Sequence, residues 1–178
     1  MKKYITILCA LLLTSSFASN AITNEEILEI ETYNIQLKSA LRLYQNADYE
    51  KALPALEVFA KRGNKVSQYI LGTMYLNSQG TNKDLMKSYA WLSVANEQRT
   101  KKWQKPLKML EEKLPEQFLV NADQEAQKYV SDFGIKAQHM KCRKVKTLGS
   151  KKGVHQCKKV EIRSGHYFVS NPTYLVSN

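Results

Sequence analysis

The chain has 178 residues, a hydrophobic fraction of 43% and a formal net charge of +11. The excess charge is uneven, because residues 22–133 carry 15 Lys and Arg against 15 Asp and Glu, whereas residues 134–178 carry ten against one. A basic field attracts polyanions, and here it belongs to the last quarter of the chain. The sequence has no phosphate-binding glycine loop, His-Glu metal helix or serine elbow, which excludes the enzyme classes that depend on these motifs.

Residues 1–21 have the pattern of a secretory signal peptide. Two lysines precede an apolar run over residues 4–13, and small residues follow, with 16–18 or 19–21 as candidate cleavage sites. The apolar run is too short for a membrane span. Cys9 lies inside this run, which is not the position of a cysteine that carries a lipid. We therefore expect a bacterial protein that is periplasmic or secreted and not transmembrane after cleavage.

A helix is predicted at the start of the mature chain. Thr23 and Glu26 form a capping box, and apolar residues follow at three- and four-residue steps from Ile27 to Tyr44. The chain turns at residues 46–48. A second helix should then run to a stop at Gly63, with Pro54 as a candidate site of bending.

A 36-residue period links the second helix to the stretch that follows it. Four positions recur at this distance, Asp48, Ala52, Leu56 and Ala60 as Asp84, Ser88, Leu92 and Asn96. Residues 64–99 should thus form a helical repeat, with helices over about 66–77 and 84–98 and a glycine-marked loop between them. Such a unit cannot bury its apolar face alone, so it stacks on neighbours. The period predicts an α-solenoid, whose usual product is a concave surface that binds another chain.

The same residues resemble the Sel-one-like repeat family, whose repeat carries Ala-x-Ala-Gln-Tyr-x-Leu-Gly-x-x-Tyr, a Gly-x-Gly loop and Asp-x-x-Lys-Ala-x-x-Trp. The positions that match are Gln68, Tyr69, Leu71, Gly72, Tyr75, Gly80, Asp84, Lys87 and Trp91. Serines replace family alanines at 67 and 88 and the first loop glycine at 78, which implies looser packing in the same fold. The resemblance, most specific over 64–99, implies a scaffold or adaptor that binds a protein or peptide partner.

Two more helices are predicted over about 101–113 and 115–133, with Pro115 suited to a first helical position and Gly134 to a cap. Six helices make about three antiparallel pairs. The expected fold class is mainly α, a short α-solenoid in residues 22–133 followed by a small disulfide-bridged β-hairpin tail.

The tail, residues 134–178, has a different periodicity. Short runs over 139–146 and 154–162 alternate apolar and charged residues and are joined by turn-forming residues, which predicts a β-hairpin. Residues 166–170 and 173–176 could add one or two strands.

Two cysteines, Cys142 and Cys157, remain after signal cleavage. In an oxidising compartment such a pair indicates one disulfide across the hairpin. The alternative is a zinc site built from these cysteines with His139 and His155, although the spacing fits no common zinc pattern. Free thiols are the third alternative. No metal and no cofactor is expected.

Basic residues crowd around the cysteines and are candidates for binding anions. They are Lys141, Arg143, Lys144, Lys146, Lys151, Lys152, Lys158, Lys159 and Arg163. Export argues against nucleic acid as the partner and favours an anionic envelope component, such as lipopolysaccharide phosphates, anionic lipid head groups, cell-wall polymers or an acidic protein. The alternative is a solvated face that only aids solubility.

Catalysis is not predicted. All three histidines fall in the tail, where Glu161 is the single acidic residue that could orient an imidazole. Tyrosines and tryptophan in the repeat lie at helical spacing, which is typical of a packed seam. Some cysteine-rich exported relatives of the repeat family are associated with β-lactam binding or hydrolysis, but residues 22–133 contain no cysteine. The sequence therefore predicts a non-enzymatic exported adaptor, with an envelope-tethering module as the alternative and a hydrolase as the remote one.

Overall fold

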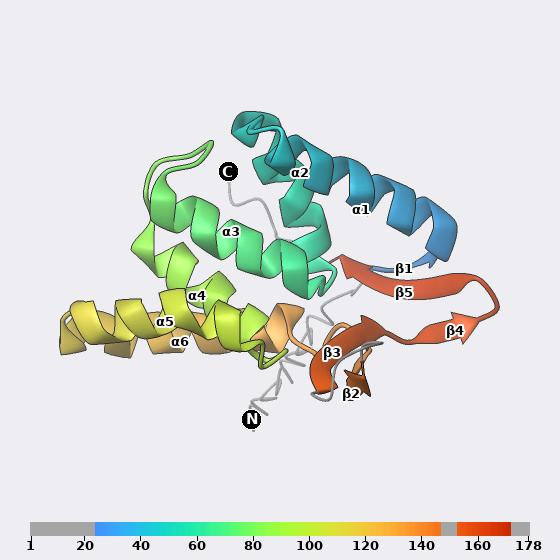
Figure 1. The fold of residues 1–178 in the computed structure, drawn as a ribbon. Helices are drawn as coiled ribbons and strands as arrows, with labels where there is room; N and C mark the ends of the chain where they lie inside the picture. Colours follow the sequence, from blue (N-terminus) through green and yellow to red (C-terminus); the bar gives the residue numbers. More distant parts are fainter. Residues whose placement is uncertain (1–23, 147–152, 172–178) are drawn as a thin grey trace, which may run out of the picture.

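The computed structural model describes residues 24–146 and 153–171. In these residues six helices form antiparallel pairs in a short α-solenoid, and strands lie at one end of it (Figure 1). The helices are α1 (Ile30–Gln45), α2 (Tyr49–Lys61), α3 (Lys65–Asn77), α4 (Leu85–Asn96), α5 (Lys101–Lys113) and α6 (Glu116–Phe133). The predicted mainly α fold with a bridged hairpin is confirmed.

The strands make two small antiparallel sheets. They are β1 (Asn24–Glu29), β2 (Met140–Lys146), β3 (Gly153–Lys159), β4 (Glu161–Arg163) and β5 (His166–Asn171). β2 pairs with β3 as the predicted hairpin, and the second sheet has the order β1-β5-β4. The run expected over 154–162 is thus divided between β3 and β4, while the strand expected at 173–176 lies outside the described residues.

The first helix was predicted to begin too early. Residues 24–29 form a strand instead, in which Ile27 pairs with Phe168 and Glu29 with His166 of β5, and α1 begins at Ile30. The capping-box pattern was a local helix signal, and it was overridden by hydrogen bonds to a strand near the other end of the chain. Thr23 lies outside the described residues.

The 36-residue period corresponds to equivalent positions in successive repeats. Asp48 and Asp84 occupy the N-cap positions of α2 and α4, and the Asp84 side chain accepts a hydrogen bond from the Lys87 N–H at 2.9 Å. Leu56 and Leu92 are both fully buried on these helices. The second helices of two repeats therefore present the same face to the core. Helix α2 continues past Pro54 to Lys61.

Two apolar clusters form the core. The first joins α1 to α4 and includes Phe133 from the end of α6 and Val169 from β5, and the second lies between α4, α5 and α6. Gly72 allows the close approach of α3 to α4, because a Cβ at this position would lie 2.6 Å from Leu92 Cγ.

The disulfide prediction is also confirmed. Cys142 and Cys157 are directly opposite each other in β2 and β3 and are bonded. The four-ligand zinc alternative is wrong for this structure, because both thiols are used in the bridge and the His139 ring packs against Phe168. Within the described ranges, every helix is too short or too polar to cross a membrane.

Candidate functional site

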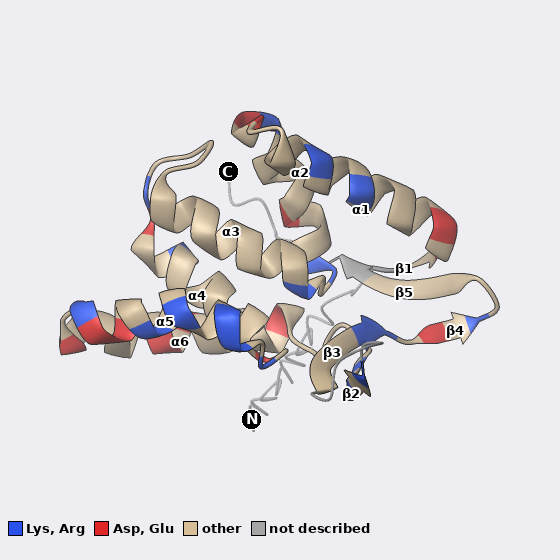
Figure 2. Ribbon diagram, viewed as in Figure 1, with Lys and Arg blue, Asp and Glu red and all other residues tan. Residues whose placement is uncertain are grey.

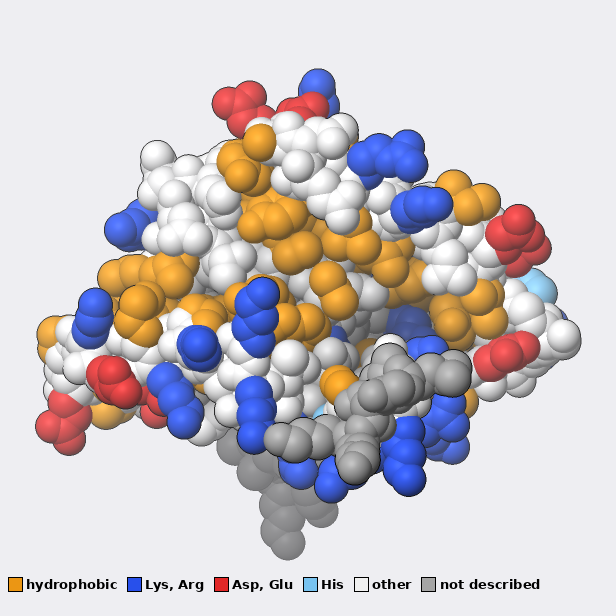
Figure 3. All heavy atoms as spheres, in the orientation of Figure 1, with side chains coloured by type: hydrophobic (Ala, Val, Ile, Leu, Met, Phe, Trp, Pro, Cys, Tyr) orange, Lys and Arg blue, Asp and Glu red, His pale blue; other side chains and the backbone are white. Residues whose placement is uncertain are grey.

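An aromatic strip runs across the first helices of the three pairs. We define it as Tyr44 on α1, Tyr69 on α3 and Trp103 on α5, all of them half-buried. The Tyr69 and Trp103 rings stack with 4.9 Å between their centroids and 11° between their planes. Burial raises the pKa of Tyr69, and nearby Tyr44 adds to this rise. Figure 3 shows an apolar band that crosses α5, α3 and α1 on this face.

Further apolar surface adjoins the strip. Val66 lies one helical turn before Tyr69 on α3 and is 40% exposed, and Leu76 continues the same side of the helix and is half-buried. Contiguous apolar surface of this kind is typical of a site for a partner chain.

One edge of the strip is basic. Helix α5 carries exposed lysines on both sides of Trp103 in the sequence, at positions 101, 102, 105 and 108. Figure 2 shows Lys and Arg at several positions along α5, with Asp and Glu towards its C-terminal end. Exposed lysines of the first half of α5 therefore adjoin the strip.

Most residues that match the repeat family have structural roles. Gln68 is buried, and its Nε2 donates to the carbonyl oxygens of Ala60 at 2.8 Å and Phe133 at 2.9 Å. Trp91 stacks on Phe133 and meets Tyr129 edge to face. Tyr75, Tyr89 and Trp91 are buried in the seam between helices, as predicted, whereas Tyr69 is half-buried and belongs to the aromatic strip.

Tyr89 also belongs to this packing. Its hydroxyl donates to Asp123 Oδ1 at 2.6 Å, which links α4 to α6. Burial and this hydrogen bond both raise the pKa of Tyr89.

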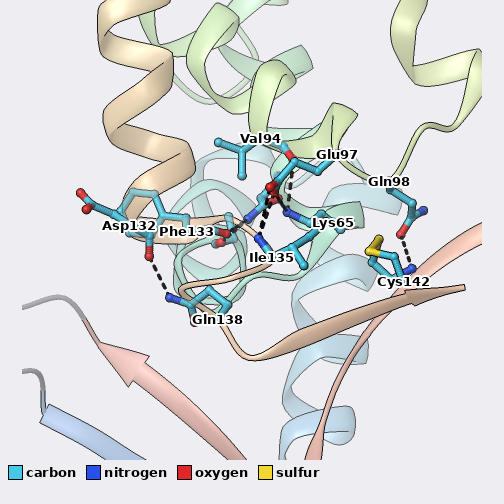
Figure 4. Close-up of polar contacts among 12 residues, drawn as sticks. Lys65, Val94, Glu97, Gln98, Asp132, Phe133, Ile135, Gln138 and Cys142 are labelled. Carbon is cyan, nitrogen blue, oxygen red and sulfur yellow. Dashed lines mark hydrogen bonds and ion pairs between the residues drawn. A yellow bond between two sulfur atoms is a disulfide. The ribbon is translucent and has the colours of Figure 1, made fainter.

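A buried ion pair joins the helices to the tail, and the sequence did not reveal it. Lys65 Nζ lies 2.7 Å from Glu97 Oε2 and also donates to Gln68 Oε1 and the Val94 carbonyl (Figure 4). Glu97 Oε2 accepts a further hydrogen bond from the Ile135 N–H at 3.1 Å. Burial lowers the pKa of Lys65, and Glu97 opposes this effect.

The neighbouring residue Gln98 holds the hairpin. Its backbone oxygen lies 3.0 Å from His155 Nδ1, and its side-chain oxygen accepts from the Cys157 N–H at 3.4 Å. The end of α4 therefore contacts both the start of the tail and strand β3.

The basic candidates of the tail do not form one cluster. Strand alternation places Lys141, Arg143 and Lys158 on the outer face of the hairpin, where all three are exposed and Lys141 is directly opposite Lys158. Lys144 and Lys146 are exposed on the alternate positions, and Arg163 is exposed on β4. Lys151 and Lys152 lie outside the described residues.

Lys159 is separate from the surface lysines. Its Nζ donates to the carbonyl oxygens of Gln138 and Phe168, each at 3.0 Å. Burial lowers the pKa of Lys159 to about 8, and Arg62 adds to this shift. Strand alternation could have revealed this position, because Lys159 follows the inward-facing Cys157 by two residues.

Three potential metal ligands and two of the histidines lie in the strands of the tail. Cys142, His155 and Cys157 bring potential ligand atoms within 4.8 Å of one another, but the disulfide removes both thiols. The imidazoles of His155 and His166 contact backbone oxygens. A catalytic imidazole is usually oriented by a carboxylate, so these contacts do not form a base of that kind.

Comparisons with known proteins support the fold. No protein-family model and no curated protein matches the chain. A similar solved structure is that of c5321, a protective antigen of uropathogenic Escherichia coli strains that displays an SLR fold; the TM-score is 0.53 and the identity 22%. The match covers 65% of this chain and 27% of that one. The present chain thus matches about a quarter of that protein, and the likeness shows a helical-repeat fold.

Proposed function

We propose that the chain is a non-enzymatic adaptor of the Sel-one-like repeat type, and that the aromatic strip binds a peptide segment of another protein. The observation that carries this proposal is the strip itself, Tyr44, Tyr69 and Trp103, displayed on the first helices of three stacked pairs. Solenoids commonly use such surfaces to bind partners, and Tyr and Trp supply a large share of the binding energy at interfaces.

The partner segment carries apolar or aromatic side chains flanked by Asp or Glu. Its apolar side chains cover the strip and Val66, which is 40% exposed. Its acidic side chains face the exposed lysines of α5. Complementary charges at the rim mainly set orientation and association rate, while the buried aromatic contacts set affinity.

We place this function in the periplasm or outside the cell. The signal-peptide pattern of residues 1–21 and the Cys142–Cys157 disulfide support export, since disulfides persist in oxidising compartments.

A peptide-display selection tests the adaptor function. Random peptides selected on the mature protein should be enriched in aromatic residues with neighbouring Asp or Glu. Tyr69→Ala and Trp103→Ala should each weaken binding of the selected peptides by about 2 kcal/mol, which is roughly 30-fold.

The control is Val120→Ala on α6, where the valine is also exposed and lies outside the strip. It should leave peptide binding unchanged. Selected peptides that bind the two strip variants as tightly as the parent protein, with all variants folded by circular dichroism, would refute the strip as the binding site.

A second candidate function is tethering to anionic envelope surfaces through the outer face of the hairpin. Lys141 lies directly opposite Lys158, with Arg143 next to it on the same face. Like charges in opposite positions destabilise a sheet, and an anionic surface would relieve this repulsion.

Vesicles with anionic lipids test the tether. Replacing Lys141, Arg143 and Lys158 together by glutamine should weaken vesicle binding by about 1 kcal/mol per residue, and added salt should do the same. The matched control replaces three exposed lysines of the helical body, Lys38, Lys83 and Lys128. Equal losses in the two triple variants would contradict a hairpin-specific site.

A further inference from the structure

A hollow lies where the helical body meets the strands. It has a volume of about 280 Å³ and is bounded by α1, the turn between α2 and α3 with the start of α3, and strands β2, β3 and β5. Its polar lining includes Tyr33, Asn34, Asn64, Lys159 and Tyr167. Figure 3 shows a recess between α1 and the hairpin with Lys or Arg atoms deep inside it.

The hollow contains the partly buried ammonium of Lys159, which has no carboxylate partner in the described part of the chain. Lys159 Nζ has two carbonyl oxygens as partners, those of Gln138 and Phe168. Lys65, which also lines the hollow and is buried, is paired with Glu97 at 2.7 Å. An ammonium has three N–H donors, so Lys159 retains one for a ligand.

Other features of the hollow also favour a negative charge. Helix α3 begins at its edge, at Lys65, so the positive end of the helix dipole lies there. Asn64 contacts the hydroxyl of Tyr33 through a hydrogen bond, and Asn34 and Tyr167 add neutral polar groups to the wall.

We propose that this hollow binds a small monocarboxylate, about the size of one amino-acid residue, with its carboxylate against the Lys159 ammonium. The Lys159 ammonium balances one negative charge, whereas Lys158, which also lines the hollow, is exposed on the outer face of the hairpin. The volume lies just below the usual range of ligand pockets, which limits the ligand to a few heavy atoms. The site is separate from the aromatic strip and does not rest on the adaptor function.

Binding should be linked to protonation of Lys159. Its pKa of about 8 leaves it mostly charged at pH 7 and mostly neutral at pH 9. A carboxylate favours the charged form, so affinity should be constant between about pH 5 and 7, where the ligand is ionised, and fall about tenfold between pH 7 and 9.

Other ionisable groups border the hollow. Lys158 lines it, Arg62 is close to Lys159, and Lys65 remains beside Glu97. Burial raises the pKa of Tyr33 to about 12 and also raises that of Tyr167, which keeps both hydroxyls protonated over this pH range.

Nuclear magnetic resonance titration of the mature protein tests the proposal with three probes. N-acetylglycine carries the carboxylate, N-acetylglycinamide is its neutral analogue, and inorganic phosphate tests for a general anion site. N-acetylglycine should shift signals of Tyr33, Met140 and Tyr167, which line the hollow, whereas the amide should not. An equal response to the amide, phosphate binding as tight as that of N-acetylglycine, or no response to any probe would overturn the proposal.

Two variants sharpen the test. Lys159→Met keeps the apolar stem and removes the ammonium, so it should reduce N-acetylglycine affinity at least tenfold. Lys128→Met is the control, an exposed lysine on α6 away from the hollow, and should bind normally. If Lys159→Met does not fold, the pH profile of the parent protein decides, and an affinity that stays constant from pH 7 to 9 would overturn the assignment.

Discussion

The ion pair between Lys65 and Glu97 gives a quantitative test of how the tail is attached. The Lys65 side chain is 1% exposed and that of Glu97 is 23% exposed. Glu97→Gln keeps the size of the side chain and an oxygen for the Ile135 N–H, but it leaves a buried ammonium without a counter-ion. Removing one partner of a buried pair costs about 3–5 kcal/mol, so we expect a loss of this size in the free energy of unfolding.

The reciprocal change should cost less. Lys65→Met leaves Glu97 partly exposed and still bound to the Ile135 N–H, so we expect a loss of about 1–3 kcal/mol. In the double variant neither charge is left buried without its partner. Its loss should therefore be smaller than the sum of the two single losses by at least about 1 kcal/mol.

Urea unfolding followed by circular dichroism measures these differences. The control is Lys128→Gln, which removes an exposed ion pair to Glu125 at 3.2 Å and should cost less than about 1 kcal/mol. The deficit of Glu97→Gln should also shrink as pH rises. Burial lowers the pKa of Lys65, so the native state loses the proton before the unfolded state does. A cost of Glu97→Gln equal to that of the control would refute the role of the pair.

Gly72→Leu should overpack the seam between α3 and α4 against Leu92 and lower the free energy of unfolding by about 1–3 kcal/mol. Leu92→Ala should leave a cavity and lower it by about 2–5 kcal/mol. Urea midpoints equal to the parent value would show that this seam is not packed as described. Replacing Cys142 and Cys157 by alanine should reduce stability by about 2–4 kcal/mol, because the bridge closes a loop with a sequence separation of 15, and an unchanged melting temperature would contradict this. The pKa of Lys159 is lowered to about 8 by burial, so the unfolded state binds more protons than the native state between pH 8 and about 10. This lysine therefore makes the free energy of unfolding rise with pH in that range. Lys159→Met should show a smaller rise, and parallel pH profiles of the two proteins would contradict the shift.

The helices could be predicted from the sequence because their signals are local or repeat at a fixed distance. Asp48 and Asp84 mark equivalent helix starts, and the leucines at 56 and 92 mark equivalent buried faces. These positions depend on one repeat and its nearest neighbour, which is the range over which a solenoid is specified. The aromatic strip was harder to predict from the sequence. Tyr69 and Trp103 belong to different repeats, and their stacking depends on how those repeats are rotated.

Features that join distant segments were missed for a different reason. β1 is a strand because β5 supplies its hydrogen-bonding partner, and local patterns near Glu26 contain no information about residues 166–171. Lys65 and Glu97 are 32 residues apart, and each has the sequence context of a surface charge. Their burial becomes evident only when α3, α4 and the start of the tail are in place.

The pairing of β1 with β5 also predicts the result of removing the tail. Val169 of β5 is fully buried in the cluster that contains helices α1 to α4, and Glu97 loses its Ile135 partner if the chain ends at residue 133. Burying a valine side chain contributes about 1.5–3 kcal/mol, and the unmatched edge of β1 would add an aggregation-prone surface. The fragment 22–133 should therefore melt at a lower temperature and self-associate more than the mature chain, as measured by circular dichroism and light scattering. A fragment with the stability of the mature chain would show that the tail is an independent appendage, and truncation could then separate the two candidate functions. If the expected loss is observed, they can be separated by point variants such as Trp103→Ala on the strip and Lys141→Gln on the hairpin.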